Sequence, residues 1–331
     1  MEIDRIDDAL VRRVSTMFVP TSDCKSAVEP FDILLAAGAA VGGLCLLICG
    51  ESGVGKSTLI RWLTKNLKDV KTDTGWSRPA IFVEVPSSPT AIAVCEALLD
   101  ALGDPRPSAG TRPQKFRRLR EKLAEQKVRL LVLDDLQHVF DRDSERILFD
   151  ASEGIKQILV EHPMSILCAG LVDASKVVDS NEQLKRRHMA TVQLRRFDWT
   201  NMRSRSSFIA VLSAVVKAMD DFEFPDLEDE SVAVRFYLGS GGIMDFIFKI
   251  FLLATWFSMK AKKTTVGMKE FSKAWRIGLL HSAGQDDPFT IELGDEANLA
   301  SRVEKAKQIN LPSPRQPKKK RASSRLRETG L

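Results

Sequence analysis

The glycine-rich stretch between residues 50 and 58 constrains the fold of this chain more than any other feature. An apolar run, LCLLIC (44–49), precedes it, and a helical pattern follows from about residue 57 to residue 67. The loop reads GESGVGKS and matches the pattern GxxxxGK[ST] in full. A buried strand, a glycine loop and a helix in this order place phosphate groups at a helix N-terminus. The sequence therefore predicts a nucleoside triphosphate site.

The residue types in this phosphate loop explain how it would work. Glycines let the backbone approach closely, so that N–H groups can point at phosphate oxygens. Lys56 is predicted to reach the β- and γ-phosphates, and the Ser57 hydroxyl to bind Mg²⁺. The expected cofactors are ATP and Mg²⁺. The predicted nucleotide contacts are Gly50, Glu51, Ser52, Gly53, Val54, Gly55, Lys56, Ser57 and Thr58.

A second apolar run, RLLVLDD (129–135), supplies the acidic residues that hydrolysis requires. Asp134 stands at the end of the predicted strand, where it can hold Mg²⁺ through water. Asp135 follows and can orient or deprotonate the attacking water. A buried strand ending in a polar turn is the alternative, but the phosphate loop upstream favours the functional interpretation. Asp135 is one methylene shorter than the Glu usual at this place, which predicts slow, switch-like hydrolysis.

Strands and helices alternate over the first two thirds of the chain. Further strands are expected at 80–85, 165–169 and 192–197, and helices at 2–18, 26–37, 89–102, 114–127 and 144–161. Such alternation predicts an α/β fold with a parallel sheet covered on both faces. After Thr200 the pattern becomes helical, at 200–219, 229–238, 243–259 and 268–281. We therefore expect an N-terminal extension (1–25), an αβα nucleotide-binding domain (26–199), a smaller helical lid (200–285) and an extended, largely disordered basic tail (286–331).

Charge and hydropathy narrow the class of protein. The net charge is +5, but residues 312–331 alone hold seven Lys or Arg and one Glu, so the body is nearly neutral. That tail could contact nucleic acid or an acidic partner, or merely aid solubility. The uncharged run 33–50 is about as long as a membrane helix, but glycines interrupt it and the phosphate loop follows. Five cysteines without a CxxC pair indicate reduced thiols. We expect a cytoplasmic protein with no membrane segment.

Several stretches resemble a known family. A phosphate-loop α/β core followed by a helical lid is the AAA+ plan. More narrowly, the chain resembles the TniB/TnsC ATPases of bacterial transposons over roughly residues 20–280. The resemblance rests on VEVPSSPTAIAVCEALLDALGDPRPSAGT (83–111), RLLVLDDLQHVF (129–140), CAGLVDASKVV (168–178) and NEQLKRRHMATVQLRRFDW (181–199). It implies an ATPase that forms homo-oligomeric rings or filaments on double-stranded DNA. It also implies two protein partners from the same element, a transposase and a target-selector protein.

The resemblance implies further site residues, of which this chain contains some and lacks others. In AAA+ rings an arginine from one subunit completes the neighbour's site, and the LxxR frame of NEQLKRRH points to Arg187 in that role, with Arg186 as the less favoured choice. A solvated basic turn is the alternative. The lid of such proteins usually offers a Gly-x-x-Arg, but this chain reads Gly242-Ile243-Met244-Asp245. The expected lid arginine is missing, and Lys249, one turn later, is either a substitute or an ordinary solvated lysine.

The helix predicted at 114–127 is the candidate DNA contact. Phe116, Leu119 and Leu123 form its apolar stripe, and basic residues occupy much of the remaining surface. Contacts to the DNA backbone need Lys or Arg aimed at phosphates, without base readout. A solvated amphipathic helix explains the same pattern. The family resemblance favours DNA contacts by Lys115, Arg117 and Arg118.

Three functions remain open from the sequence. The first is the transposition regulator that the resemblance implies. The second is another AAA+ machine on DNA, such as a replication initiator or loader. The third is a non-motor signalling NTPase, which the arginine pair and the helical lid argue against. Assembly on duplex DNA in the presence of ATP would support the first, and a stable monomer the third.

Overall fold

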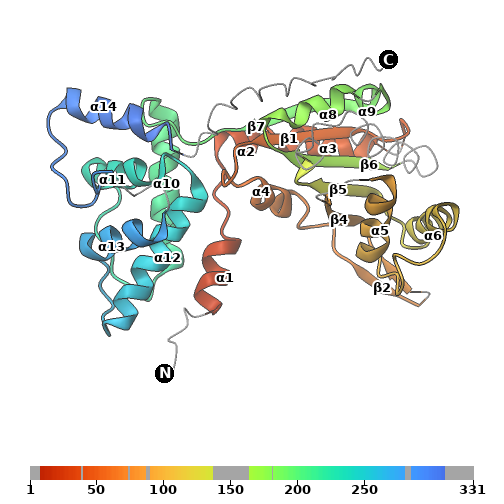
Figure 1. Ribbon diagram of the computed structural model, residues 1–331, viewed down its shortest axis with the longest axis horizontal. Helices are drawn as coiled ribbons and strands as arrows, with labels where there is room; N and C mark the ends of the chain where they lie inside the picture. The colour runs from red at the N-terminus through yellow and green to blue at the C-terminus, as the bar shows by residue number, and fades with distance from the viewer. Residues whose placement is uncertain are drawn as a thin grey trace, which may run out of the picture.

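The computed structural model describes residues 8–38, 40–73, 75–86, 90–136, 164–180, 182–279 and 285–309. A strand-rich part and a helical part stand side by side, joined by the chain that leaves β7 (Figure 1). The predicted helix at 144–161 and the basic stretch at 312–331 lie outside the described residues.

The strand-rich part contains a five-stranded sheet in which every pairing is parallel. Its inner strands are buried on both faces, as expected for continuous apolar runs in a parallel sheet. In order across the sheet, the strands are β4 (Ala80–Glu84), β5 (Leu130–Asp134), β6 (Ser165–Gly170), β1 (Cys45–Gly50) and β7 (His188–Leu194). This confirms the predicted α/β class.

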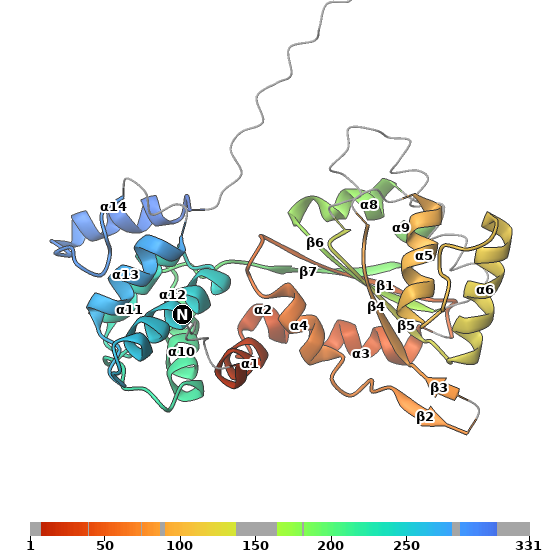
Figure 2. The ribbon, with the colours of Figure 1, turned by 60° about the horizontal axis from the view of Figure 1, so that its bottom comes forward.

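Helices cover both faces of the sheet. One face packs against α3 (Val28–Ala37) and α4 (Lys56–Leu63). The opposite face packs against α5 (Ala91–Ala101), α6 (Arg112–Glu125), the 3₁₀ turn η2 (Val172–Ala174) and α8 (Ser175–Ser180). Figure 2 shows α3 and α4 on one side of the strands and α8 on the other. The remaining elements here are α2 (Ser22–Lys25), α9 (Glu182–Arg187) and the hairpin of β2 (Val70–Thr72) and β3 (Gly75–Ser77).

The last strand begins and ends earlier than the sequence predicted. We expected 192–197, but β7 spans His188–Leu194 and pairs with β1 from Cys45 to Gly50. Its first residues are only partly buried because it is the edge strand, so they carry little apolar signal. Residues 195–197 leave the sheet and lead to the lid, which places Arg196 beside the phosphate loop.

The helical lid consists of α10 (Met202–Ala218), α11 (Glu230–Ser240), α12 (Met244–Lys260), α13 (Met268–Gly278) and α14 (Glu296–Ala306). Aromatic residues fill its core, including Phe208, Phe236 and Phe271, each with 0% of its surface exposed. Within the described residues no single helix is long and apolar enough to span a bilayer, although α11 and α12 pass that test together as a pair bent by 109°.

The expectation of an extended segment after residue 285 is wrong for residues 285–309. These residues include α14, and they bury Phe289, Val303, Ala306 and Ile309 in the same core as the preceding lid helices. The apolar side chains at 303 and 306 stand three residues apart, so they lie on one face of the helix and pack against the lid. The lid core therefore continues to at least Ile309.

The N-terminal extension also joins the lid core. Helix α1 (Asp8–Thr16) buries Leu10 and Val14 among lid residues, although it belongs to the opposite end of the sequence. Arg13 donates to Asp220 and Asp221 just beyond the end of α10, at 2.8 and 2.5 Å. Figures 1 and 2 show α1 beside the lid helices. The chain therefore runs from the lid to the sheet before it reaches the phosphate loop.

Candidate nucleotide-binding site

The phosphate loop begins where the buried strand β1 ends at Gly50, and two further glycines, Gly53 and Gly55, allow a tight wrap into α4. Gly53 and Gly55 have φ angles of +79° and +99°, which other residues rarely adopt. A Cβ on Gly53 would also lie 2.9 Å from the Cβ of Asp245 in the lid. Glycine at 53 is thus required both by the backbone and by the approach of α12.

Lys56 is the buried cation of the loop, with 9% of its surface exposed. Its Nζ donates to the backbone carbonyls of Gly50 at 3.1 Å and Glu51 at 2.8 Å. Burial lowers the pKa of Lys56, while the negative charges of Asp134 and Asp135 oppose that change. A desolvated ammonium held between two acids and a loop of N–H donors is well placed to bind phosphate.

Ser57 and Asp134 meet as the sequence predicted. The Ser57 hydroxyl donates to Asp134 Oδ2 at 2.9 Å, and Asp134 Oδ1 accepts from the Asp135 backbone N–H at 2.9 Å. Both groups offer hard oxygen ligands, which fit Mg²⁺ when phosphates and waters complete its shell. Among the described residues there is no group of three or more His, Cys, Asp or Glu arranged for a metal. When bound, Mg²⁺ would neutralise charge on the phosphates.

Asp135 has an unusual backbone conformation for a residue with a side chain. Its φ angle is +58°, in the left-handed region that Asp and Asn tolerate better than most residues. It lines the phosphate pocket together with Asp134 and Ser57. Strained backbone at such a place is typical of functional sites. Because Asp adopts this conformation more readily than Glu, the backbone gives a structural reason for Asp at this position.

Two adjoining cavities provide room for a nucleotide. The first, of about 220 Å³, is lined by the phosphate loop, by Asp134 and Asp135, and by Met244, Asp245 and Phe248 of the lid. The second, of about 290 Å³, shares Gly55, Thr58 and Met244 with the first. Its other walls come from residues 17–24, 194–207 and Gly242. No sequence motif indicated this second cavity, because three distant segments form it.

The lid approaches the phosphate loop through the N-terminus of α12. The Asp245 backbone N–H donates to Gly53 O at 3.1 Å. Its carboxylate pairs with Lys249 at 2.7 Å, and about half of each side chain is exposed. The position where a lid arginine was expected therefore presents an acid at the pocket, and the Lys249 ammonium is engaged by that acid.

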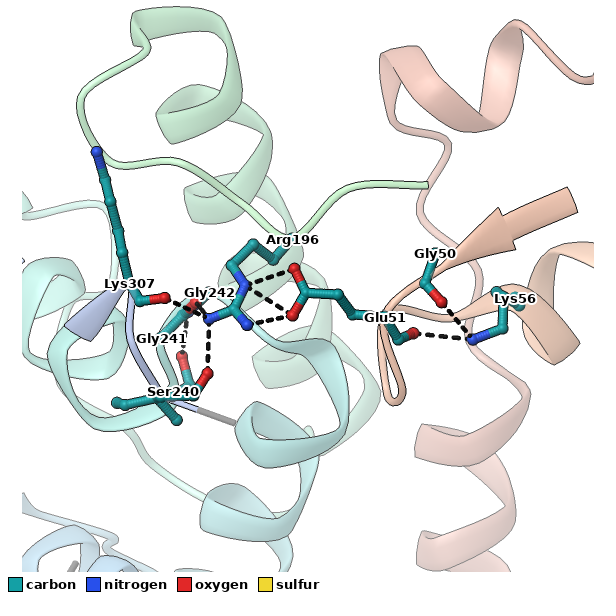
Figure 3. Close-up of polar contacts among 9 residues, drawn as sticks. Gly50, Glu51, Lys56, Arg196, Ser240, Gly241, Gly242 and Lys307 are labelled. Carbon is teal, nitrogen blue, oxygen red and sulfur yellow. Dashed lines mark hydrogen bonds and ion pairs between the residues drawn. The ribbon is translucent and has the colours of Figure 1, made fainter. Parts of the chain in front are cut away.

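Glu51 lies in the phosphate loop, but its carboxylate points toward the lid. It forms an ion pair with Arg196, whose Nε lies 2.9 and 3.1 Å from the two carboxylate oxygens (Figure 3). The predicted nucleotide contact at Glu51 can therefore come only from its backbone. Arg196 is a site residue that the sequence did not reveal.

Arg187 and Arg186 lie at the opposite end of the sheet from the phosphate loop. His188, the next residue, pairs with Cys45 at the start of β1, whereas the loop begins at Gly50. Five residues of strand span about 16 Å at 3.3 Å per residue, so Arg187 lies far from its own phosphate pocket. Partial burial lowers the pKa of Arg187. Arg187 therefore does not act on the phosphates of its own chain here, and its role in a neighbouring subunit's site remains a prediction.

Two of the three residues predicted to contact DNA are engaged within the protein instead. Lys115 is 7% exposed and forms an ion pair with Glu96 of α5. Arg118 donates to the carbonyls of Arg106 and Ala109, each at 3.0 Å, and so holds the loop before α6. Both side chains face the protein because the buried face of α6 is wider than its apolar stripe. Arg117, with 63% of its side chain exposed, still faces solvent.

Replacing Lys115 with Ala is expected to destabilise the protein by about 1–3 kcal/mol, because Glu96 loses its partner at a partly buried site. Arg117→Ala on the same helix is the matched control, with an expected change within about 0.5 kcal/mol. Urea unfolding followed by circular dichroism measures both. Equal stabilities for the two variants would show that Lys115 has no structural role.

Comparisons with known proteins agree with this architecture. A family model described as "Bacterial TniB protein" matches residues 12–199. No curated protein matches the sequence. Among solved structures, the ORC2 protein of Aeropyrum pernix, in ADPNP and ADP complexes, matches with a TM-score of 0.59 and 14% identity, over 80% of this chain and 71% of that chain.

Two further solved structures are similar. The ORC1 protein of Aeropyrum pernix in complex with DNA gives a TM-score of 0.54 and 15% identity, over 78% of this chain and 65% of that chain. Cdc6p of Pyrobaculum aerophilum gives a TM-score of 0.56 and 18% identity, over 80% of this chain and 69% of that chain. At these identities the likeness concerns the fold alone, and it agrees with the predicted phosphate-loop α/β core followed by a smaller C-terminal helical lid.

The family match covers the phosphate loop, the acidic strand and the arginine pair, and it extends over more than half of the chain. The phosphate loop and the acidic strand build the phosphate pocket, and the arginine pair is Arg186 and Arg187, just before β7. The chain belongs to the TniB family of bacterial proteins.

Proposed function

We propose that this protein is a cytoplasmic, ATP-dependent regulator of transposition that binds DNA as an oligomer and links target selection to the transposase. Slow hydrolysis would control its assembly and disassembly. The contact of Ser57 with Asp134 beside the phosphate loop is the main support for ATP hydrolysis by this protein. Membership of the TniB family supports the link to transposition.

The geometry supports a simple division of roles in hydrolysis. Backbone N–H groups of the phosphate loop and Lys56 hold the phosphates, while Ser57 and Asp134 hold Mg²⁺. Asp135 orients the attacking water and accepts its proton. Arg187 of an adjacent copy would neutralise charge on the γ-phosphate, so that hydrolysis depends on assembly.

DNA binding is the part of the proposal that needs the most direct test. An ORC1 protein of the same fold has been solved in complex with DNA, and Arg117 offers an exposed cation on α6. Size-exclusion chromatography and negative-stain electron microscopy, with and without ATP and duplex DNA, should reveal a ring or filament only when both ligands are present. A monomer under all conditions would favour the signalling NTPase instead.

The likeness to ORC and Cdc6 proteins keeps a replication initiator or loader as the second candidate. The two candidates differ in their protein partners. A pull-down with the transposase and target-selector protein of the same element should retain this protein in an ATP-dependent way. Retention by a replicative helicase, and not by the transposase, would favour the second candidate.

Arg187→Ala is expected to leave ATP binding intact but to lower assembly-dependent hydrolysis by about 10³-fold or more, as loss of a finger arginine does. Mixing this variant with Lys56→Ala, which keeps its arginine but cannot bind ATP, should restore part of the activity. Steady-state phosphate release measures both. Normal turnover of the single variant would remove Arg187 from the site, and Arg186→Ala would then be tested in the same way.

A further inference from the structure

The guanidinium of Arg196 joins three segments that are far apart in sequence. On one side, its Nε and Nη2 engage the Glu51 carboxylate in the phosphate loop. On the other side, its Nη1 donates to three carbonyl oxygens: Gly241 at 3.3 Å, Lys307 at 3.1 Å and Ile309 at 2.8 Å. Figure 3 shows Arg196 between Glu51 and the lid. Both charged side chains are mostly buried, with 11% of Arg196 and 29% of Glu51 exposed.

On the lid side, Gly241 lets the backbone come close to the Arg196 guanidinium. Gly241 ends α11 in the left-handed region, with a φ angle of +60°. A Cβ at Gly241 would lie 2.6 Å from Ala306 O and 3.3 Å from Arg196 Nη1, so glycine is what lets these segments converge. Lys307 and Ile309 follow α14, and the basic stretch at 312–331 comes next in the sequence. Arg196 therefore anchors the end of the lid core.

On the phosphate-loop side, Glu51 connects Arg196 to Lys56. The Glu51 carbonyl accepts from Lys56 Nζ at 2.8 Å, while the Glu51 carboxylate binds Arg196. Lys56 is the residue that must bind the phosphates. Phosphates that order the loop would also fix the Glu51 backbone, which reduces the entropy lost when its carboxylate pairs with Arg196.

We infer that Arg196, acting through Glu51, couples nucleotide binding to the anchoring of residues 307–309, so that bound nucleotide tightens the C-terminal end of the lid core. The inference requires only the nucleotide binding contained in the proposed function. Coupling between two sites is reciprocal, so the anchored C-terminal segment also favours nucleotide binding. Arg196 lines the second cavity but not the phosphate pocket, whereas Glu51 lines neither, so the Glu51 variant tests the coupling without removing a wall of either cavity.

Hydrogen–deuterium exchange of the full-length protein tests the coupling, with and without Mg²⁺ and a non-hydrolysable ATP analogue. In the wild type, amides of residues 303–309 are expected to exchange on the order of 10-fold more slowly with nucleotide, within the usual range of coupling between sites. Glu51→Gln removes the charge but keeps the shape, and Arg196→Lys keeps the charge but loses the planar fork. Both variants are expected to lose this nucleotide response and to bind the analogue about 10-fold more weakly.

Arg235→Lys is the matched control. Arg235 Nη1 donates to the carbonyls of Pro288 at 2.8 Å and Ile291 at 2.9 Å, so it also holds the C-terminal segment, but from within the lid. This variant is expected to speed exchange at residues 285–293 while the nucleotide response at 303–309 persists. A merely structural role for Arg196 would make the two arginine variants behave alike.

The possible results separate the two proposals. Nucleotide binding without any change in exchange at 303–309 would overturn the coupling and leave the proposed function standing. A nucleotide response that survives in Glu51→Gln would overturn it as well, even if Arg196→Lys fails to fold. The variant that combines Glu51→Gln with Arg196→Lys tests whether the two residues act as one unit. Its loss of nucleotide affinity should then be no larger than that of the weaker-binding single variant. No nucleotide binding by the wild type would defeat the proposed function itself.

Discussion

Lys56→Ala is expected to lose ATP binding almost completely. The Lys56 ammonium is buried at the phosphate loop and is the only lysine lining the phosphate pocket among the described residues. Hydrogen bonds to charged groups contribute about 1.5–3 kcal/mol each, so loss of two such bonds to phosphate lowers affinity on the order of 10²-fold or more. Isothermal titration with ATP and Mg²⁺ measures the effect.

Lys65→Ala is the control for Lys56. Lys65 lies two residues past the end of α4, is exposed and stands over the Trp62 ring at 4.8 Å. Lys65→Ala changes the net charge by the same amount as Lys56→Ala. It is expected to keep ATP affinity within twofold of the wild-type value. Because Lys56 also holds the carbonyls of Gly50 and Glu51, thermal unfolding must show that the variant remains folded. Wild-type affinity in folded Lys56→Ala would place the nucleotide elsewhere.

Asp135→Asn is expected to bind ATP normally and to lose about 10²- to 10⁴-fold in turnover, the usual contribution of a general base. Asn tolerates the left-handed backbone at φ +58° as Asp does, so the substitution removes the charge without a change of backbone. Single-turnover phosphate release, with ATP affinity measured in parallel, separates hydrolysis from binding. Unchanged turnover would assign water activation to another group.

Asp135→Glu extends this test to the length of the carboxylate. If the short side chain limits hydrolysis, the variant turns over ATP faster than the wild type. The longer residue is less well suited to the left-handed conformation, so a small loss of thermal stability should accompany the gain. A variant no faster than the wild type would leave the backbone conformation as the reason for Asp at this position.

The sequence predicted those parts of the site that short stretches of chain encode. The phosphate loop depends on glycine torsions and on a strand and helix next to it in sequence, so its pattern is visible in the eight residues 50–57. Asp134 and Asp135 follow an apolar run whose end must fall at the same sheet edge as the loop, because parallel strands share direction. The structure brings Ser57 and Asp134 together as expected.

Surface residues were predicted less well. Helix α6 was identified correctly as amphipathic, but the apolar stripe did not reveal that Lys115 lies on its buried face. The partner that allows this burial, Glu96, belongs to another helix. A long basic side chain can be a surface cation or a buried ion-pair partner, and only its tertiary neighbours distinguish the two.

By itself, the sequence determined the α/β core with its lid, the phosphate loop, the acidic strand and the family resemblance, since each rests on local periodicity or on a short motif. Only the tertiary structure decided how the lid, the N-terminal helix and residues 307–309 meet at the nucleotide site. Glu51 and Arg196 are 145 residues apart, and their contact depends on where β7 ends and on how the lid core packs. Such contacts leave no periodic trace in the sequence, because the residues that make them are brought together by the packing of distant segments.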